Sequence, residues 1–256
     1  MTLEAEQLYL YAIVDGAADA VADSAPLDAA APAGLGDAPV WLLPIHTLAA
    51  VVGPVDVKLL KDTTVAAQAH EQVVEWFMAR QGTLPVRFGT VFSNAAALVE
   101  ALDPQYATIA ADLQRLSGRV EIGLRILWDG AAMRAAAEQQ APPAVQETGE
   151  EAGQGLRYMQ QRLREAAIER NLKQAAETLA QQCRQRLAPH AETVVTRILA
   201  TEGIPVSAAL LVARGGVEDL VAEIAQFQRE LHPLHVICTG PWPPYHFVST
   251  TKGGES

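Results

Sequence analysis

The sequence is poor in cysteine, and this shortage already limits the chemistry that the protein can perform. Its 256 residues include only two cysteines, Cys183 and Cys238. They lie far apart with no CxxC spacing, which fits thiols that stay free in a reducing cytoplasm and fill space as small apolar groups. For Cys238 we expect such a buried position.

Long hydrophobic runs are also missing. The first seven residues, MTLEAEQ, carry acids where a signal peptide needs Lys or Arg. The uncharged stretch of most interest here, residues 38–55, is interrupted by Pro39, Pro44 and Pro54. A membrane helix needs about 20 continuous apolar residues, so this stretch predicts strands and turns. We expect a cytoplasmic protein without a membrane span.

Basic residues are scarce in the first half of the chain. Residues 1–152 carry 20 acidic and 8 basic side chains, whereas residues 153–256 carry 10 and 11. Nucleic-acid binding draws its affinity from clustered bases, so we expect no nucleic-acid partner. The surplus of acids is interpreted as a contribution to solubility rather than to steering.

The motifs of the common catalytic and nucleotide-binding sites are absent. The sequence has no strand followed by GxGxxG, no GxxxxGK[ST] and no GxSxG. His70 and Glu71 begin like the zinc-protease motif HExxH, but Val74 occupies the position of the second ligand, so we expect a hydrogen bond from His70 at the surface or between domains. His235 and Cys238 would point to opposite faces of one strand and cannot act as a pair. We therefore predict a non-enzymatic protein without catalytic, cofactor-binding or metal-binding residues.

Residues 1–138 are predicted to form an α+β domain with a ferredoxin-like fold and one half-open face of its sheet. The clearest strand covers residues 119–128, where apolar and polar residues alternate. The other predicted strands are 7–14, 40–43, 47–52 and 84–88, and the predicted helices are 65–80, 93–102 with Ser93 as N-cap, and 103–116.

Residues 139–153 are poor in large apolar groups and are predicted to be a linker or long surface loop. Residues 154–187 then predict one helix of about 50 Å. Its apolar stripe moves roughly 150° round the helix near Ala167. Two explanations are open: the halves pack on different domains, or the helix kinks near Ala167.

The remaining segments, 193–200, 206–213, 217–231 and 234–239, read as β-β-α-β. With the long helix they form a smaller C-terminal α/β domain over residues 154–256.

Two features stand out as candidate binding residues. Arg87 and Glu121 lie opposite the main apolar sets of their strands, and we expect either a salt bridge between them or a recognition surface. The closing segment, residues 239–247, is stiffened by three prolines and carries Trp242, Tyr245 and Phe247. These aromatic side chains either anchor a partner or fold back to seal an intramolecular core.

At these same residues the sequence resembles a known family. The block Leu84 to Phe92 (LPVRFGTVF), the helix with His70 before it, the strand 119–128 after it and the closing GPWPPY block at residues 240–245 are together similar to the gas vesicle protein F/L family. The order of these blocks is consistent over nearly the whole chain. Only residues 17–38 and 139–153 have no recognisable counterpart.

The resemblance implies an accessory or minor structural protein needed to assemble gas vesicles, with an N-terminal ferredoxin-like part, a C-terminal α/β part and no known catalytic residue or cofactor. It further implies contact with the small hydrophobic shell protein and other gas vesicle accessory proteins. The candidate partner-binding residues are Arg87, Phe88, Trp242, Tyr245 and Phe247. The alternative is a ferredoxin-like enzyme or small-ligand-binding protein with an anion site near Arg87, which a perturbed His or carboxylate in a concave site there would favour.

Overall fold

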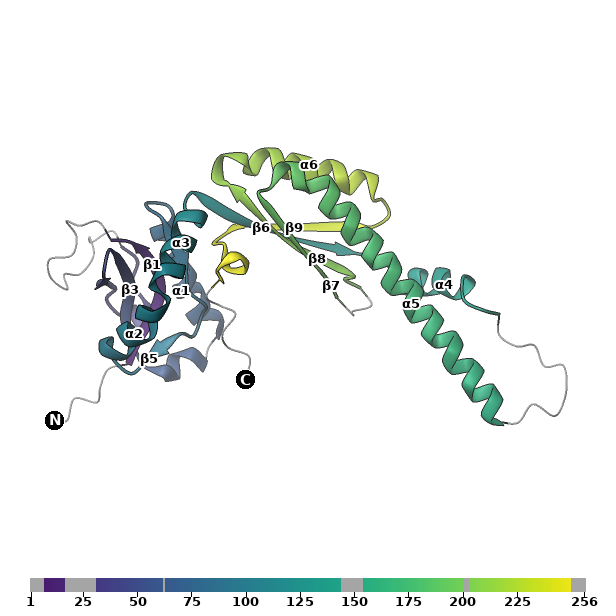
Figure 1. Ribbon diagram of the computed structural model, residues 1–256, viewed down its shortest axis with the longest axis horizontal. Coiled ribbons are helices and arrows are strands. Elements are labelled where there is room, and N and C mark those ends of the chain that lie inside the picture. Colours follow the sequence, from purple (N-terminus) through teal and green to yellow (C-terminus); the bar gives the residue numbers. More distant parts are fainter. Residues whose placement is uncertain (1–6, 17–30, 62, 144–153, 200–202, 250–256) are drawn as a thin grey trace. The chain divides into compact units, whose positions relative to one another are not determined.

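The computed structural model describes residues 7–16, 31–61, 63–143, 154–199 and 203–249 (Figure 1). The chain divides into two compact units. The first comprises residues 1–121 and 241–256, and the second comprises residues 122–240. Each unit has its own sheet and its own helices, so the protein is of the α+β class.

The first unit contains a five-stranded sheet with the strand order β2-β3-β1-β4, in which β5 also pairs with β1. The pairings β1–β3, β1–β4, β1–β5 and β2–β3 are all antiparallel. Its strands are β1 (Gln7–Asp15), β2 (Trp41–Ile45), β3 (Leu48–Val55), β4 (Thr83–Pro85) and β5 (Val91–Phe92). Pro44 lies in β2, an edge strand, where a missing backbone donor is tolerated.

The central strand β1 is buried along nearly its whole length. A shift of register between Leu10 and Ala12 places one extra residue in β1. This irregularity lets Tyr9 and Tyr11, and then Ala12, belong to the same core cluster, although strict alternation would separate the last two. The cluster also contains Val73, one of the residues that α1 contributes.

Three α-helices belong to the first unit: α1 (Thr63–Met78), α2 (Ala95–Leu102) and α3 (Tyr106–Leu116). Asn94, and not Ser93, caps α2, because its side chain accepts a hydrogen bond from the Ala97 amide at 2.9 Å. Short 3-10 turns complete the chain at Leu35–Asp37, Val57–Lys61, Asp103–Gln105, Ala188–His190, Arg214–Gly216 and Tyr245–Phe247.

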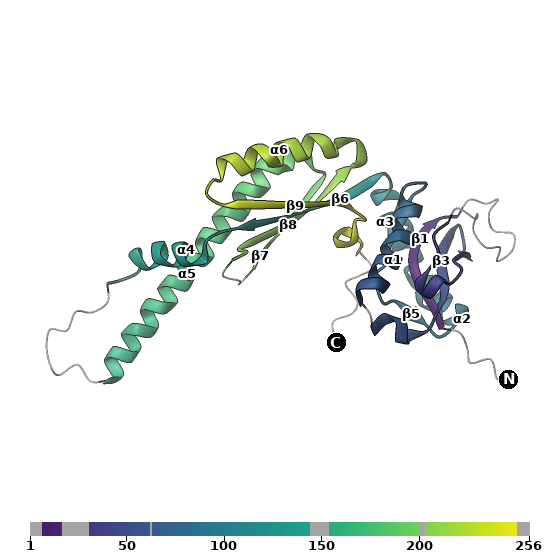
Figure 2. The ribbon, with the colours of Figure 1, turned by 180° about the vertical axis from the view of Figure 1, so that it is seen from behind.

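The second unit contains a four-stranded sheet with the order β7-β8-β6-β9. Its elements are β6 (Arg119–Leu127), α4 (Gly130–Gln139), α5 (Gln154–Leu187), β7 (Thr193–Ile198), β8 (Val206–Ala213), α6 (Val217–Glu230) and β9 (His235–Trp242). With α5 and α6 as its main helices, this is a β-α-β-β-α-β arrangement, the element order of a ferredoxin-like domain. Figure 2 shows α5 and α6 beside this sheet.

The core of the second unit joins three elements to β8. Strand β6 contributes Ile122, Leu124 and Ile126. The C-terminal half of α5 contributes a run of residues that ends at Leu187, and α6 contributes Phe227. The sheet face toward these helices is therefore the buried one.

The ferredoxin-like prediction for residues 1–138 is not confirmed. In the first unit three strands precede the first long helix, and the ferredoxin-like element order occurs instead in the second unit. The reason is strand 119–128. We assigned it to the N-terminal domain, but β6 lies between β8 and β9 in the second sheet. The division at residue 121 accordingly differs from the predicted linker at 139–153, of which residues 144–153 lie outside the described residues.

Several element boundaries also differ from the predictions. The predicted strand 84–88 ends at Pro85, and residue 139 closes a helix, α4, that was not predicted. Strand β9 runs on through Pro241 to Trp242, although we expected the prolines to end it sooner. Because β9 is an edge strand, a residue without a backbone donor is tolerated in it. The 34-residue helix α5 is continuous, so the kink considered near Ala167 is absent.

Candidate partner-binding surfaces

The closing segment is fastened to the first unit by polar contacts at four places. The Glu121 carboxylate accepts a hydrogen bond from the His246 amide at 3.0 Å and contacts His246 Nδ1 at 2.5 Å. Arg115 donates to the backbone carbonyl of Phe247 at 2.6 Å. Two residues beyond the segment, the hydroxyl of Ser249 donates to Asp112 at 2.9 Å. Glu121 and Asp112 are buried carboxylates, so the accepting side of their contacts is shielded from water, which strengthens these hydrogen bonds.

The fourth fastening is a chain of hydrogen bonds that begins on β1. The Gly89 amide donates to the Tyr9 hydroxyl at 2.9 Å, and this hydroxyl lies 3.0 Å from His70 Nδ1. On the other side of the ring, His70 Nε2 lies 3.0 Å from the Tyr245 hydroxyl, which donates to Glu71 at 2.9 Å. Since Tyr245 gives its proton to Glu71, His70 must donate from Nε2 and accept from Tyr9 at Nδ1. The ring is therefore neutral and held in one tautomer.

Burial accounts for the perturbed acid–base properties of this chain of groups. His70 is completely buried, and burial lowers its pKa to about 4, an effect that a hydrogen bond with the Val86 backbone opposes. Burial also raises the pKa of Glu71, which its hydrogen bond from Tyr245 opposes. The pKa of Tyr245 is raised, first by burial and then by the negative charge of Glu71. His70 does form a hydrogen bond with Tyr245, a residue that we had assigned to the C-terminal domain, but the bond is buried and both residues lie in the first unit.

The predicted binding residues fall into two groups. Tyr245 and Phe247 are turned inward, and Phe88 packs with its ring centroid 5.8 Å from that of His70. Of the two outcomes open for the closing segment, the structure favours the intramolecular seal at these positions. Arg87 and Trp242 are exposed, the latter by 43%.

Glu121 binds His246, whereas we had expected Glu121 and Arg87 to form either a salt bridge or a recognition surface. The contact fastens the closing segment, as described above. His70, whose pKa is lowered, lies close to residues 86–88. A ligand site near Arg87 would be expected to contain such a residue. Both ring nitrogens of His70 are engaged by tyrosines of this chain, however, and this arrangement favours closure over ligand binding.

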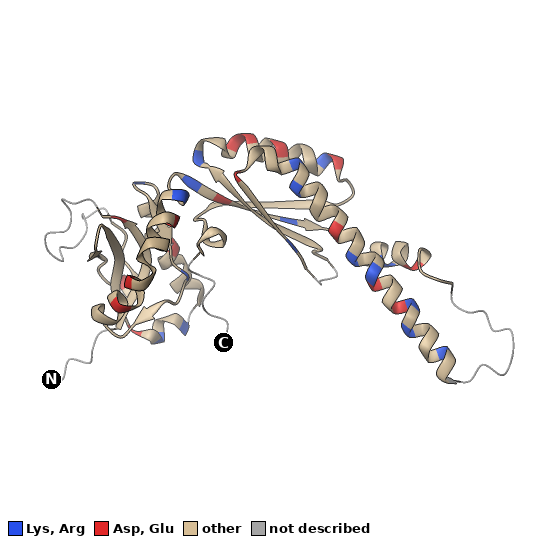
Figure 3. Ribbon diagram, in the orientation of Figure 1, with Lys and Arg blue, Asp and Glu red and all other residues tan. Residues whose placement is uncertain are grey.

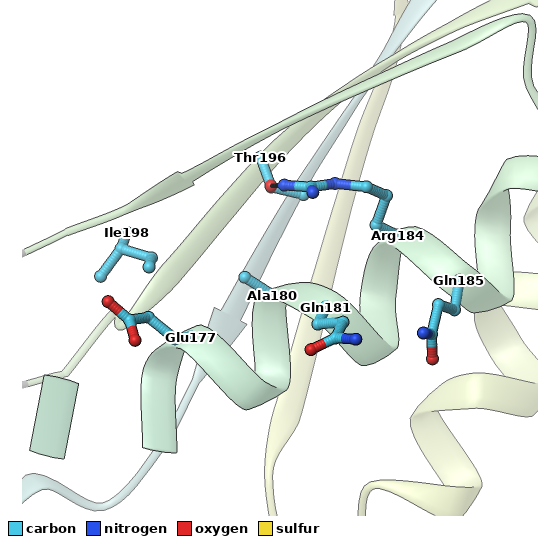
Figure 4. Close-up of a pocket in the computed structure, with 7 residues that line it drawn as sticks. All are labelled: Glu177, Ala180, Gln181, Arg184, Gln185, Thr196 and Ile198. Carbon is cyan, nitrogen blue, oxygen red and sulfur yellow. Dashed lines mark hydrogen bonds between the residues drawn. The ribbon is translucent and has the colours of Figure 1, made fainter. Parts of the chain in front are cut away.

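A shallow groove lies in the second unit between α5 and the edge strand β7 (Figure 4). Arg184 crosses it and donates a hydrogen bond to the Thr196 hydroxyl. The groove is lined by Glu177, Ala180, Gln181, Arg184, Gln185, Thr196 and Ile198. Its lining mixes both charges with amides and lacks the convergent polar groups of a catalytic site.

The first half of α5 presents large apolar side chains to solvent. Leu156, Met159 and Leu163 are 51%, 61% and 65% exposed, and Tyr158 beside them is 63% exposed. The packing of α5 on α4 involves residues 167 and 168, and its packing on the sheet begins further along. We had considered that this half of the helix packs on a domain, but its stripe is exposed.

Two further expectations concern metals and thiols. Within the described ranges no three His, Cys, Asp or Glu side chains gather in a way that would hold a metal ion. Cys183 is buried, which raises the pKa of its thiol to about 11. Cys238 is exposed on the edge strand β9, so the prediction that it is a buried filler is wrong. In the same described part of the chain, no helix is both long and apolar enough to cross a membrane.

Comparisons with known proteins identify relatives over nearly the whole chain. The family described as gas vesicle synthesis protein GvpL/GvpF matches residues 7–249. Gas vesicle protein L of Streptomyces sp. (strain CB03234) is 27% identical over 86% of this chain and 86% of its own length. Gas vesicle protein L1 of Halobacterium salinarum is 25% identical over 94% of this chain and 89% of its own.

Solved structures show the same fold. The crystal structure of the gas vesicle protein GvpF from Anabaena sp. PCC7120 matches with a TM-score of 0.73 and 24% identity, covering 95% of this chain and 98% of that one. The structure of GvpF from Microcystis aeruginosa also matches with a TM-score of 0.73, at 22% identity. The class is thus that of α+β gas vesicle proteins. This chain belongs to the GvpL/GvpF family, as the resemblance of its LPVRFGTVF and GPWPPY blocks had indicated.

Proposed function

We propose that this protein acts without catalysis in gas vesicle assembly, where it binds the small hydrophobic shell protein and other gas vesicle proteins. The observation that carries the proposal is the family match over residues 7–249. We place its work in the cytoplasm and at the growing vesicle.

The physical need for such a protein follows from the shell itself. A small subunit that will form a gas-filled wall must present a large apolar surface, and exposed apolar surface drives aggregation before assembly. A binder that covers this surface would keep the subunit soluble until it is added to the wall.

In this proposal the closing segment supplies a contact surface on the first unit. Tyr245 and Phe247 fix the segment from inside, which lowers the entropy that it would lose on docking. Trp242, exposed on the same stiff segment, and Arg87, exposed beyond β4, are then the side chains that meet the partner. Phe88 supports Arg87 by packing against aromatic rings of the first unit's core.

Co-expression with the small shell protein tests the proposal. We expect the chain to increase the fraction of shell protein that stays in the supernatant and to capture it in a pull-down. Trp242→Ala and Arg87→Ala should each weaken the capture by several fold, whereas His235→Ala, at the beginning of β9 in the second unit, should leave it unchanged. A well-folded chain that captures no shell protein would contradict direct binding.

A further inference from the structure

The exposed apolar residues at the beginning of α5 follow a coiled-coil spacing. Leu156, Met159 and Leu163 stand at i, i+3 and i+7, which are the a, d and a positions of a heptad. Such a narrow seam differs from the broad apolar face of a helix that packs into a globular core. We call these three residues the α5 seam.

The α5 seam has no partner among the described residues. Its side chains are between 51% and 65% exposed. Helix α4 packs on α5 at Ile168, which occupies the heptad position most distant from the seam, and at Ala167, which lies one helical turn beyond Leu163. The seam therefore faces away from the only helix that packs on this part of α5 in the described chain.

The charges around the seam indicate which partner would fit. Residues 155–164, GLRYMQQRLR, contain three arginines and no acidic residue. Figure 3 shows this basic character at the beginning of α5. Arg162 occupies a g position directly beside the seam, and its guanidinium lies 5.8 Å from the ring centroid of Tyr158. Charges at this position select partners of opposite sign.

Two other occupants fit less well. A second copy of this chain fits less well, because its own segment 155–164 contains no acidic residue that could meet Arg162. The chain's own segment 144–153, AVQETGEEAG, is acidic, but Val145 is its single large apolar residue, so it cannot fill the seam.

We propose that the α5 seam is a docking site for an amphipathic helix of another protein, whose apolar heptad stripe is flanked by Asp or Glu. The inference goes beyond the proposed function, because it concerns a surface on the second unit and a helical partner, whereas the shell contact was placed on the first unit.

A synthetic helical peptide of about three heptads provides the probe, with Leu at a and d and Glu at e and g. Its glutamates repel each other between peptide copies, so self-association does not compete with binding. The control peptide carries Lys at e and g. Binding to the full chain is measured by fluorescence anisotropy at low and high salt.

We expect the Glu peptide to bind and the Lys peptide to bind at least about tenfold more weakly, with the difference shrinking as salt screens the charges. Met159→Asp should weaken binding of the Glu peptide by about tenfold or more. Gln161→Asp, an equal change of charge on the opposite side of the same exposed helix, should have a much smaller effect.

The inference is overturned if both peptides bind equally, if neither binds, or if Met159→Asp and Gln161→Asp act alike. It is also overturned if sedimentation shows that the chain pairs with itself through the seam and that Met159→Asp abolishes this pairing. Capture of the shell protein is scored separately, so a failure of the seam inference is distinguishable from a failure of the proposed function.

Discussion

The buried His70 should make the stability of the first unit depend on pH in a defined direction. Its pKa is about 4 in the folded protein against an ordinary value of 6.5, because burial disfavours the charged ring. As the pH falls, His70 therefore becomes protonated near pH 6.5 in the unfolded chain but only near pH 4 in the folded chain. Stability falls as the pH drops through this window and is unaffected by His70 above it.

The magnitude follows from the size of the shift. Between about pH 7.5 and pH 5 the unfolded state gains about 2 kcal/mol from protonating His70, at about 1.4 kcal/mol per pH unit below 6.5. His70 is fully buried, so solvent screening does not reduce this figure much. Glu71, whose pKa is raised, acts in the opposite direction, since its folded form binds a proton more readily on acidification.

Urea unfolding of the protein and of His70→Gln, followed by tryptophan fluorescence at both pH values, isolates the contribution of His70. We expect His70→Gln to be less stable at about pH 7.5 because it disturbs the hydrogen bonds to Tyr9 and Tyr245. The gap between the two proteins should then shrink by about 2 kcal/mol at about pH 5. His235→Gln, which replaces an exposed histidine, serves as a control and should show the same pH dependence of stability as the original protein. A gap between the protein and His70→Gln that is the same at both pH values would refute the reasoning.

Other predictions concern the closing segment and the thiols. Tyr245→Phe keeps the ring but removes the hydroxyl between His70 and Glu71. We expect a loss of about 1–3 kcal/mol in unfolding free energy and faster proteolysis near the C-terminal end. Unchanged proteolysis would argue against the fastening of the closing segment. A thiol reagent should modify Cys238 in the folded protein and Cys183 only after unfolding, because only the first is exposed. Mass spectrometry of the modified peptides distinguishes the two, and modification of Cys183 in the folded chain would contradict its burial.

Local patterns in the sequence predicted most of the elements but not how they combine into sheets. The alternation in residues 119–128 correctly indicated a strand with Val120, Ile122, Leu124 and Ile126 on its buried face. Alternation does not say which sheet a strand joins, because pairing depends on distant segments. β6 was therefore assigned to the wrong neighbours, and the ferredoxin-like element order was expected one unit too early.

The candidate surfaces were predictable to different degrees. Three prolines near Tyr245 predicted a stiff aromatic segment. No local pattern could predict that Tyr245 would form a hydrogen bond with His70, which lies 175 positions away in the sequence. The α5 seam was visible in the sequence as a stripe that moves round the helix. Its exposure became apparent only when the structure placed α4 on the other side.

The central proposal is that this chain, a member of the GvpL/GvpF family, serves gas vesicle assembly by binding the shell protein, and the pressure-sensitive turbidity of cells tests its role in assembly most directly. Gas-filled shells scatter light until pressure collapses them. The account predicts that cells of a gas-vesicle-forming host lose this turbidity when the gene is deleted, regain it with the intact gene and regain less of it with Trp242→Ala. Cells that keep their full pressure-sensitive turbidity without the gene would contradict the account.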